Sequence, residues 1–428
     1  MKTNSNLKMK KLLILFFCYF HNVHAQTVTT FAGSTQGTTD GIGSLAKFYG
    51  PAGVALAPDG NLYVADRVNH RIRKITPSGE VSTFAGNTQG FANGNGTAAL
   101  FNSPMNLTID NAGILYVADS NNHCIRKITP DATVTTIAGS IEGFADGTTS
   151  LALFSYPEGI FVDANGILYI GDTGNQRIRK IMPNGTVTTL AGGTLGNNDG
   201  TGTSAQFWSP CGLTVDSSGT VYVAEKKNRI RKITSSGVVT TFVGNGTSGY
   251  LDGVGTAARL NTPFDITMDA SGYLYITDSS NNRIRKIMPD GTITTFAGST
   301  NGYLDGVGTA ARFNYPIGIC ASDDGMLYIG ESGGNKIRKI TTSLSSTPFN
   351  TKDIVNIYPN PSSQSIHVEF DNLSTVKINI TDGNGRLLKS VNNVANQCVI
   401  DISEFAKGIY YLQLQTDNTA IVKKILKK

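Results

Sequence analysis

Hydrophobic and polar residues alternate in short segments along most of the chain, and turn residues separate the segments. One representative stretch holds four of them, at Pro51 to Ala57, Asn61 to Ala65, Arg71 to Thr76 and Val81 to Ala85. Segments of this length and alternation predict β-strands, and the glycine-containing turns between them, such as Asp59-Gly60, predict antiparallel hairpins. The stretch is therefore expected to fold as a four-stranded antiparallel sheet.

The same pattern recurs six times. Its clearest marker is an Arg-Lys-Ile tripeptide that begins at Arg73, Arg126, Arg179, Arg231, Arg285 and Arg338. Successive markers are 53, 53, 52, 54 and 53 residues apart, and a period of this size predicts repeated structural units. Repeated four-stranded sheets arranged radially are the blades of a β-propeller. We therefore predict an all-β protein whose main domain is a six-bladed β-propeller.

The fourth strand of the pattern is displaced by one repeat. Val-Thr-Thr-Phe-Ala-Gly and its variants begin at Val28, Val81, Val134, Val187, Val239 and Ile293, so one copy precedes the first unit and none follows the sixth. The last blade is therefore expected to take its outer strand from Val28 to Gly33. This closure would hide two sheet edges.

A long connection leads from each fourth strand to the next unit. Matching positions in it hold a carboxylate or amide residue, at Asp40, Asn93, Asp146, Asp199, Asp252 and Asp305. We expect Thr97, Thr203, Thr256 and Thr309 to cap a single helical turn. The following apolar residues should pack inward, and these are Phe48, Phe101, Phe154, Phe207, Leu260 and Phe313.

The repeated unit resembles the NHL repeat. The resemblance rests on Pro51 to Asp66 and Asn69 to Ile75 and on their counterparts, and it extends from Val28 to about Ile340. It implies a propeller that presents loops on a rigid scaffold.

The N-terminus has the layout of a secretory signal peptide, assigned to residues 1–25. Four lysines precede the apolar run Leu12 to Phe20, and Ala25 offers a cleavage site that would leave Gln26 first. The run is too short to span a bilayer, and no later segment is suited to a transmembrane helix. The propeller is then assigned to residues 26–341.

The periodicity stops after Ile340. Residues 342–353 form a Ser/Thr-rich linker, and the short alternating strands of residues 354–428 predict a small immunoglobulin-like β-sandwich. This segment resembles the type A C-terminal sorting domain of the type IX secretion system, through Tyr358-Pro359-Asn360-Pro361, Lys407-Gly408-Ile409-Tyr410-Tyr411 and the lysine-rich tail.

This resemblance implies that the type IX secretion machinery handles residues 354–428 and removes them. The protein would then be secreted, or held on the outer cell surface of a Gram-negative bacterium. An adhesive sandwich domain that stays in the mature protein is the alternative.

Composition excludes several classes of function. The formal net charge of +5 is small for 428 residues, and symmetry spreads the basic tripeptides around the ring, so no nucleic-acid partner is predicted. The four cysteines outside the signal peptide occupy non-equivalent places, which argues against a disulfide framework.

Metal and catalytic sites are poorly supported. His70 and His123 occupy equivalent loops but cannot supply a three-ligand zinc site alone, and we interpret them as solvent-facing. The Asp-Gly-x-Gly stretches offer one acid per loop, so calcium is left as the only cofactor in question. Asp66 and its five counterparts are expected to pair with the Arg or Lys that opens the next strand, such as Arg71.

Variation among equivalent positions suggests where a ligand binds. At the start of the first strands, Asn106, Glu158 and Asp265 are polar breaks in a set of small or apolar residues, and Phe264 lies near the axis with Glu158 and Asp265. Exposed aromatic residues follow a glycine in the long connections, at Phe91, Phe144, Tyr250 and Tyr303. We expect an exported binding scaffold with a glycan or protein ligand on this loop-bearing face. The alternative is a lactonase-like hydrolase or lyase that uses Glu158 and Asp265 with a divalent metal.

Overall fold

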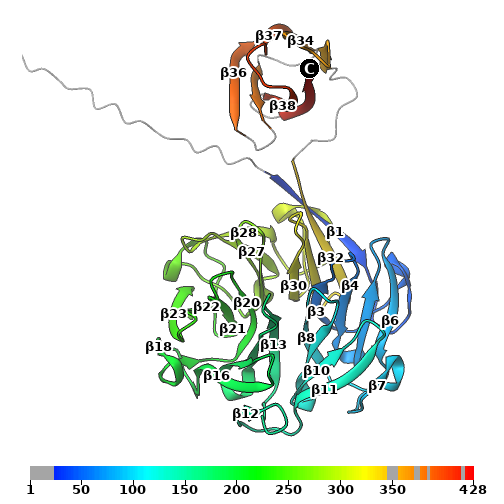
Figure 1. Cartoon of the computed structure of the whole chain (residues 1–428), viewed down its shortest axis with the longest axis vertical. Helices are drawn as coiled ribbons and strands as arrows, with labels where there is room; N and C mark the ends of the chain where they lie inside the picture. The colour runs from blue at the N-terminus through cyan, green and yellow to red at the C-terminus, as the bar shows by residue number, and fades with distance from the viewer. Residues whose placement is uncertain (1–23, 345–354, 371–375, 383–385, 416–419) are drawn as a thin grey trace, which may run out of the picture. The chain divides into compact units, whose positions relative to one another are not determined.

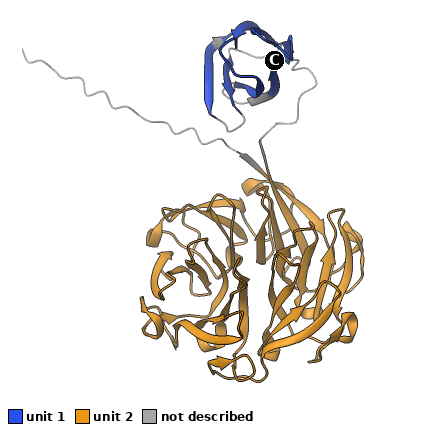
Figure 2. Cartoon of the chain, viewed as in Figure 1, with its two compact units in different colours: residues 1–25, 343–428 blue, residues 26–342 orange. Residues whose placement is uncertain are grey.

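The computed structural model describes residues 24–344, 355–370, 376–382, 386–415 and 420–428. Most of the expected signal peptide and of the linker lies outside these ranges. The chain divides into two compact units, one of residues 26–342 and the other containing residues 343–428 (Figure 2).

The larger unit contains six five-stranded antiparallel sheets (Figure 1). In the first sheet, the inner strand β3 (Pro51–Leu56) is followed outward by β4 (Leu62–Asp66), β5 (Arg71–Ile75), β6 (Glu80–Gly86) and the short β2 (Gly41–Ile42). The four longer strands were predicted. The fifth comes from the long connection, and it pairs with the fourth strand through Gly41 opposite Val81.

The next four sheets repeat this order. The second has β8 (Pro104–Ile109), β9 (Leu115–Asp119), β10 (Cys124–Ile128), β11 (Thr133–Gly139) and β7 (Gly94–Asn95). The third has β13 (Pro157–Val162), β14 (Leu168–Asp172), β15 (Arg177–Ile181), β16 (Thr186–Gly192) and β12 (Gly147–Thr148). The fourth has β20 (Pro210–Val215), β21 (Val221–Glu225), β22 (Arg229–Ile233), β23 (Val238–Val243) and β18 (Gly200–Thr201). The fifth has β25 (Pro263–Met268), β26 (Leu274–Asp278), β27 (Arg283–Ile287), β28 (Thr292–Gly298) and β24 (Gly253–Val254).

The sixth sheet is completed by the N-terminal strand. From the inside outward it contains β30 (Pro316–Ala321), β31 (Leu327–Glu331), β32 (Lys336–Leu344), β1 (His24–Ala32) and β29 (Gly306–Val307). The predicted closure is therefore present, and β1 also pairs with β29 through Val28 opposite Gly306.

The six inner strands form a ring. Each of β3, β8, β13, β20, β25 and β30 contacts the next, and β30 contacts β3. Each sheet is thus one blade, and the prediction of an all-β propeller is confirmed. The apolar residues of the long connections are completely buried as expected, at Phe48, Phe101, Phe154, Phe207, Leu260 and Phe313.

The short turns in the long connections differ from the prediction in one respect. They are 3-10 turns, such as Gly96–Ala98 and Gly255–Ala257, and no side-chain hydrogen bond caps them. Thr97 and Thr256 lie inside the turns and not at their N-caps. A glycine with positive φ opens each of these turns, with Gly96 at +54°, so the local bend depends on glycine and not on a threonine cap.

The C-terminal unit is a two-sheet structure. One sheet contains β33 (Val355–Tyr358), β34 (Ser365–Phe370) and β37 (Gln397–Asp401). The other contains β36 (Leu387–Val394), β35 (Val376–Thr381), β38 (Gly408–Gln415) and β39 (Ala420–Lys427). Apolar side chains from both sheets share one buried core, including Val368, Ile378 and Leu412. This arrangement agrees with the predicted β-sandwich.

Candidate functional site

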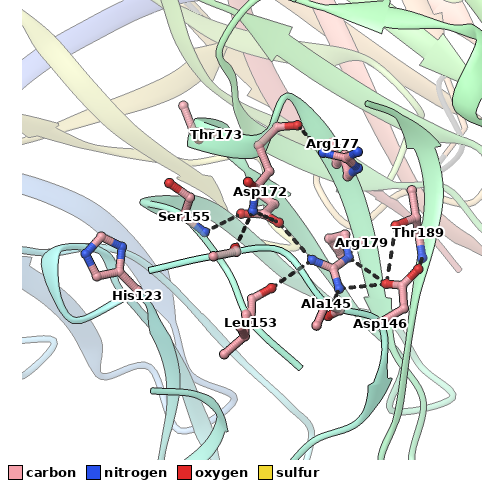
Figure 3. Close-up of polar contacts among 12 residues, drawn as sticks. His123, Ala145, Asp146, Leu153, Ser155, Asp172, Thr173, Arg177, Arg179 and Thr189 are labelled. Atoms are coloured by element: carbon pink, nitrogen blue, oxygen red, sulfur yellow. Dashed lines mark hydrogen bonds and ion pairs between the residues drawn. The ribbon is translucent and has the colours of Figure 1, made fainter. Parts of the chain in front are cut away.

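A buried ion pair recurs in every blade, but its partners differ from those we expected. In the third blade, Nη1 of Arg179 lies 2.8 Å from Oδ2 of Asp172, and both side chains are fully buried (Figure 3). Equivalent pairs join Arg73 to Asp66, Arg126 to Asp119, Arg231 to Glu225, Arg285 to Asp278 and Arg338 to Glu331. The expected pairing of Asp66 with Arg71 is wrong.

The loop carboxylates are a second partner of the same arginines. Asp146 accepts hydrogen bonds from Nε and Nη2 of Arg179, at 3.0 and 2.6 Å, and from the Thr189 backbone and hydroxyl (Figure 3). Asp40, Asp199, Asp252 and Asp305 make the equivalent ion pairs. These acids, which we had considered for calcium, hold each loop to its blade. The buried arginines cannot reach the phosphates of a nucleic acid.

His70 and His123 join neighbouring blades and do not simply face solvent. The Nδ1 atom of His70 accepts a hydrogen bond from the Ser103 N–H at 3.0 Å, and His123 does the same for Tyr156 at 3.2 Å. Gln176, Asn228, Asn282 and Asn335 make the equivalent contacts through their side-chain oxygens. Each of these residues has a φ between 52° and 63°, a conformation that asparagine and histidine tolerate better than most residues.

The centre of the ring is narrow at one level of the inner strands. The equivalent positions there are Gly53, Asn106, Gly159, Gly212, Asp265 and Gly318. A Cβ atom on Gly53 would lie 2.2 Å from Oδ1 of Asn106, and one on Gly212 would lie 2.1 Å from Oδ1 of Asp265. The two polar side chains thus fill the space that glycines leave.

Asn106 and Asp265 are therefore buried between the two faces of the propeller, and we had expected them near the rim. The Asp265 carboxylate accepts hydrogen bonds from the backbone N–H groups of Ile266 and Ile319, at 3.0 and 3.1 Å. Asn106 also donates to it. Burial raises the pKa of Asp265 to about 7.

Glu158 and Phe264 come together beside a lysine that the sequence did not single out. Nζ of Lys226 lies 2.6 Å from Oε2 of Glu158 and 4.9 Å from the centre of the Phe264 ring. Although burial opposes it, the Glu158 carboxylate raises the pKa of Lys226 above its usual value. Glu158 and Phe264 lie where two inner strands begin, and Lys226 directly follows the end of β21. We call this side of the propeller the loop-bearing face. The ion pair on it is only partly exposed.

Four aromatic side chains that we had overlooked belong to the same face. Tyr49, Tyr156, Trp208 and Tyr315 are between 37% and 42% exposed. Each stands one or two residues before the proline that opens an inner strand. The sequence does contain these aromatic residues before the prolines. Two of them stand one residue before the proline and two stand two residues before it, so a comparison of one repeat position at a time does not reveal them as a set.

The aromatic residues of the long connections form a separate, outer set. Each packs against a cation that its own blade provides. Arg177 lies 3.7 Å from the Phe144 ring, Arg283 lies 4.2 Å from the Tyr250 ring, and Lys336 lies 4.4 Å from the Tyr303 ring. In the second blade Cys124 stands in place of the usual cation, and Phe91 packs against the buried Arg126. The rings remain 45% to 68% exposed.

The two carboxylates of the alternative hydrolase or lyase have different partners. Glu158 is paired with Lys226, whereas Asp265 is held by backbone N–H groups. Among the described residues, no group of three or more His, Cys, Asp or Glu side chains could hold a metal ion. No observation on the site favours this alternative.

Comparisons with known families identify both parts of the chain. The NHL repeat family matches residues 48–75, 101–128 and 154–181, and the secretion system C-terminal sorting domain matches residues 356–428. The chain therefore carries NHL repeats and a type IX sorting domain, which indicates that the protein is secreted or placed on the outer surface of the cell. In the described part of the chain, no helix is long and apolar enough to cross a membrane.

A relative of known sequence matches the larger part of this chain. NHL repeat-containing protein 2 of Bos taurus is 30% identical over 323 residues, which cover 65% of this chain and 44% of that protein. The chain thus spans less than half of that relative's length.

Two crystal structures from Bacteroides thetaiotaomicron also match. Both have a TM-score of 0.59 and cover 74% of this chain and 76% of theirs, at 23% and 20% identity. The first is a protein of unknown function, and the second is described as an auxiliary nutrient binding protein. At these identities the likeness shows the fold alone.

Proposed function

We propose that this chain, which joins NHL repeats to a secretion sorting domain, is an extracellular binding protein that takes a glycan on the loop-bearing face of its propeller. The observation that carries the proposal is the set of partly exposed aromatic residues Tyr49, Tyr156, Trp208 and Tyr315. They stand just before the inner strands, at the edge of the ring where Glu158 of the Glu158–Lys226 ion pair also lies.

This combination suits a sugar better than an apolar ligand. Aromatic rings can pack against the C–H face of a sugar ring, while the carboxylate and ammonium groups can hydrogen-bond its hydroxyls. The ring of six inner strands holds these residues on a rigid support, so little ordering is needed when a ligand binds. The nutrient-binding description of one structural neighbour agrees with such a role.

The outer aromatic residues Phe91, Phe144, Tyr250 and Tyr303 would extend the same surface. One part of each ring already contacts a cation, and the rest remains open to a longer glycan or to a protein. Replacing Tyr250 and Tyr303 with alanine separates recognition from packing. Loss of binding at an unchanged melting temperature supports recognition, whereas a lower melting temperature with retained binding assigns the rings to packing.

The proposal is tested by applying the protein of residues 26–428, which keeps the C-terminal unit, to a glycan array and measuring the affinity of each hit by calorimetry. The variants Trp208→Ala and Tyr315→Ala should weaken binding at least tenfold without lowering the melting temperature. A matched control is Tyr358→Ala, an exposed aromatic residue of the C-terminal unit. If no glycan binds, or if both propeller variants bind as the parent does, the proposal is wrong. Capture of a protein by the same face would show that the ligand is a protein and not a glycan.

A further inference from the structure

A cavity of about 710 Å³ opens on the face opposite to the loops. Its wall contains one aliphatic residue from each inner strand, namely Val54, Leu107, Ile160, Leu213, Ile266 and Ile319. Residues of the hairpin turns that follow the inner strands form its rim, including Asp216, Ser218, Asp269 and Asp323. Asn106 and Asp265 are at its closed end, because they occupy the narrow level of the ring.

The charged groups that line the cavity have one sign. Its lining includes the four carboxyl groups of Asp216, Asp265, Asp269 and Asp323, and no lysine, arginine or histidine belongs to it. Asp216 and Asp269 also accept backbone hydrogen bonds within their own turns, which fixes where these carboxylates lie. A ligand that carries a negative charge would therefore be repelled.

Asp265 differs from the three acids of the rim because it is only 4% exposed. Its hydrogen-bond partners are the neutral donors Ile266, Ile319 and Asn106. Among the described residues, none of the ion pairs involves it, in contrast to the six buried acids that pair with arginines. Burial of a carboxylate without a cation is unfavourable, and a cationic ligand would remove that penalty.

We propose that this cavity binds a small organic amine, with its ammonium group directed at Asp265 and an apolar body against the aliphatic wall. The ammonium group supplies the opposite charge that the closed end lacks. The apolar body is stabilised because its surface leaves water when it packs against the aliphatic wall. The site is separate from the loop-bearing face, because the narrow level of the ring lies between them.

The proposal is tested by calorimetry of the mature chain with three probes of similar shape. These are cyclohexylmethylamine, the neutral cyclohexylmethanol and the anionic cyclohexanecarboxylate. We expect saturable binding of the amine at pH 8, binding of the alcohol at least tenfold weaker, and no binding of the carboxylate. Absence of amine binding, or alcohol binding as tight as that of the amine, would overturn the proposal.

Variants locate the site. Asp265→Asn removes the charge, and Thr267→Trp places a large ring in the cavity while leaving Asp265 in place; each should weaken amine binding at least tenfold. Asp110→Asn is the matched control, since Asp110 holds an equivalent turn in the second blade and does not line the cavity. Parent-like binding by a folded Thr267→Trp or Asp265→Asn protein contradicts the proposal. Trp208→Ala should leave amine binding unchanged, which distinguishes this site from the proposed glycan site.

Discussion

His70 accepts a hydrogen bond at Nδ1 from the backbone N–H of Ser103, 3.0 Å away at the start of the next blade. A backbone N–H can only donate, so the imidazole must be unprotonated at Nδ1 to make this contact. His123 makes the same contact with Tyr156. Six equivalent hydrogen bonds of this kind join neighbouring blades. Two of them therefore depend on a neutral histidine, and the other four use amide side chains.

These histidines predict an acid-sensitive stability. Burial lowers the pKa of His70 and His123 below the usual 6.5, with Glu142 partly opposing the effect at His123. The unfolded chain then binds protons more readily than the folded chain as pH falls through 6.5, so the free energy of unfolding decreases. The double variant His70→Asn and His123→Asn has asparagine at this position, as three other blades do. Its free energy of unfolding should change less between pH 7 and pH 5 than that of the parent.

Urea denaturation at several pH values measures the effect. The control is His367→Gln, because His367 belongs to the C-terminal unit, and this variant should keep the pH dependence of the propeller. If the double histidine variant loses stability with acid as steeply as the parent, the contacts do not act in this way.

One buried arginine pairs with two aspartates, and we expect replacement of the two aspartates to reduce the free energy of unfolding by very different amounts. Asp172→Asn leaves the buried Arg179 with the half-exposed Asp146 as its one carboxylate partner, and should reduce the free energy of unfolding by about 3–5 kcal/mol. Asp146→Asn should reduce it by less than about 1 kcal/mol. The second blade already has Asn93 at that position, and Arg126 donates to it. Denaturation curves of the two variants decide the matter, and equal losses would contradict it.

The pairing within the blades also shows where sequence reasoning stops. The hairpin register places Asp66 directly opposite Arg71, which is why the pattern pointed to that residue. In the structure Arg71 is the first residue of β5 and donates to the carbonyl of Asn87. Arg73, two residues further on, is long enough to reach back to Asp66 inside the blade. The register could be predicted, but the direction of a flexible side chain could not.

Other features were predictable to different degrees. The repeat period revealed the four strands of each blade, the closure by β1 and the burial of residues such as Phe48, because these follow from periodicity. The Glu158–Lys226 pair joins different blades, and no pattern within one repeat relates its two residues. Trp208 was missed because only some of the blades carry an aromatic residue at its position.

Closure by the N-terminal strand predicts that its removal is costly. Deleting residues 28–33 removes the buried Val28 and Ala32 and exposes an edge of β32. The free energy of unfolding should fall by several kcal/mol, from a typical total of about 5 to 15. Thr29→Ala changes an exposed residue of the same strand and should have little effect. An unchanged melting temperature in the deletion would show that the strand does not close the last blade.

The sorting domain predicts a shortened mature protein. The chain exported by its native host should lack residues 356–428, which match the sorting domain, and should end within or near the linker at residues 342–353. Mass spectrometry of the surface or secreted form measures this directly. An exported molecule that still ends at Lys428 would instead support a retained adhesive domain.

The claim that the loop-bearing face binds a glycan is tested most directly by the fluorescence of Trp208, the only tryptophan in the chain. Titration of the mature protein with a glycan selected on the array should change this emission and saturate at the affinity measured by calorimetry. Cyclohexylmethylamine, directed to the opposite face, should leave the emission unchanged. A glycan that binds by calorimetry without altering Trp208 emission would contradict the proposed site.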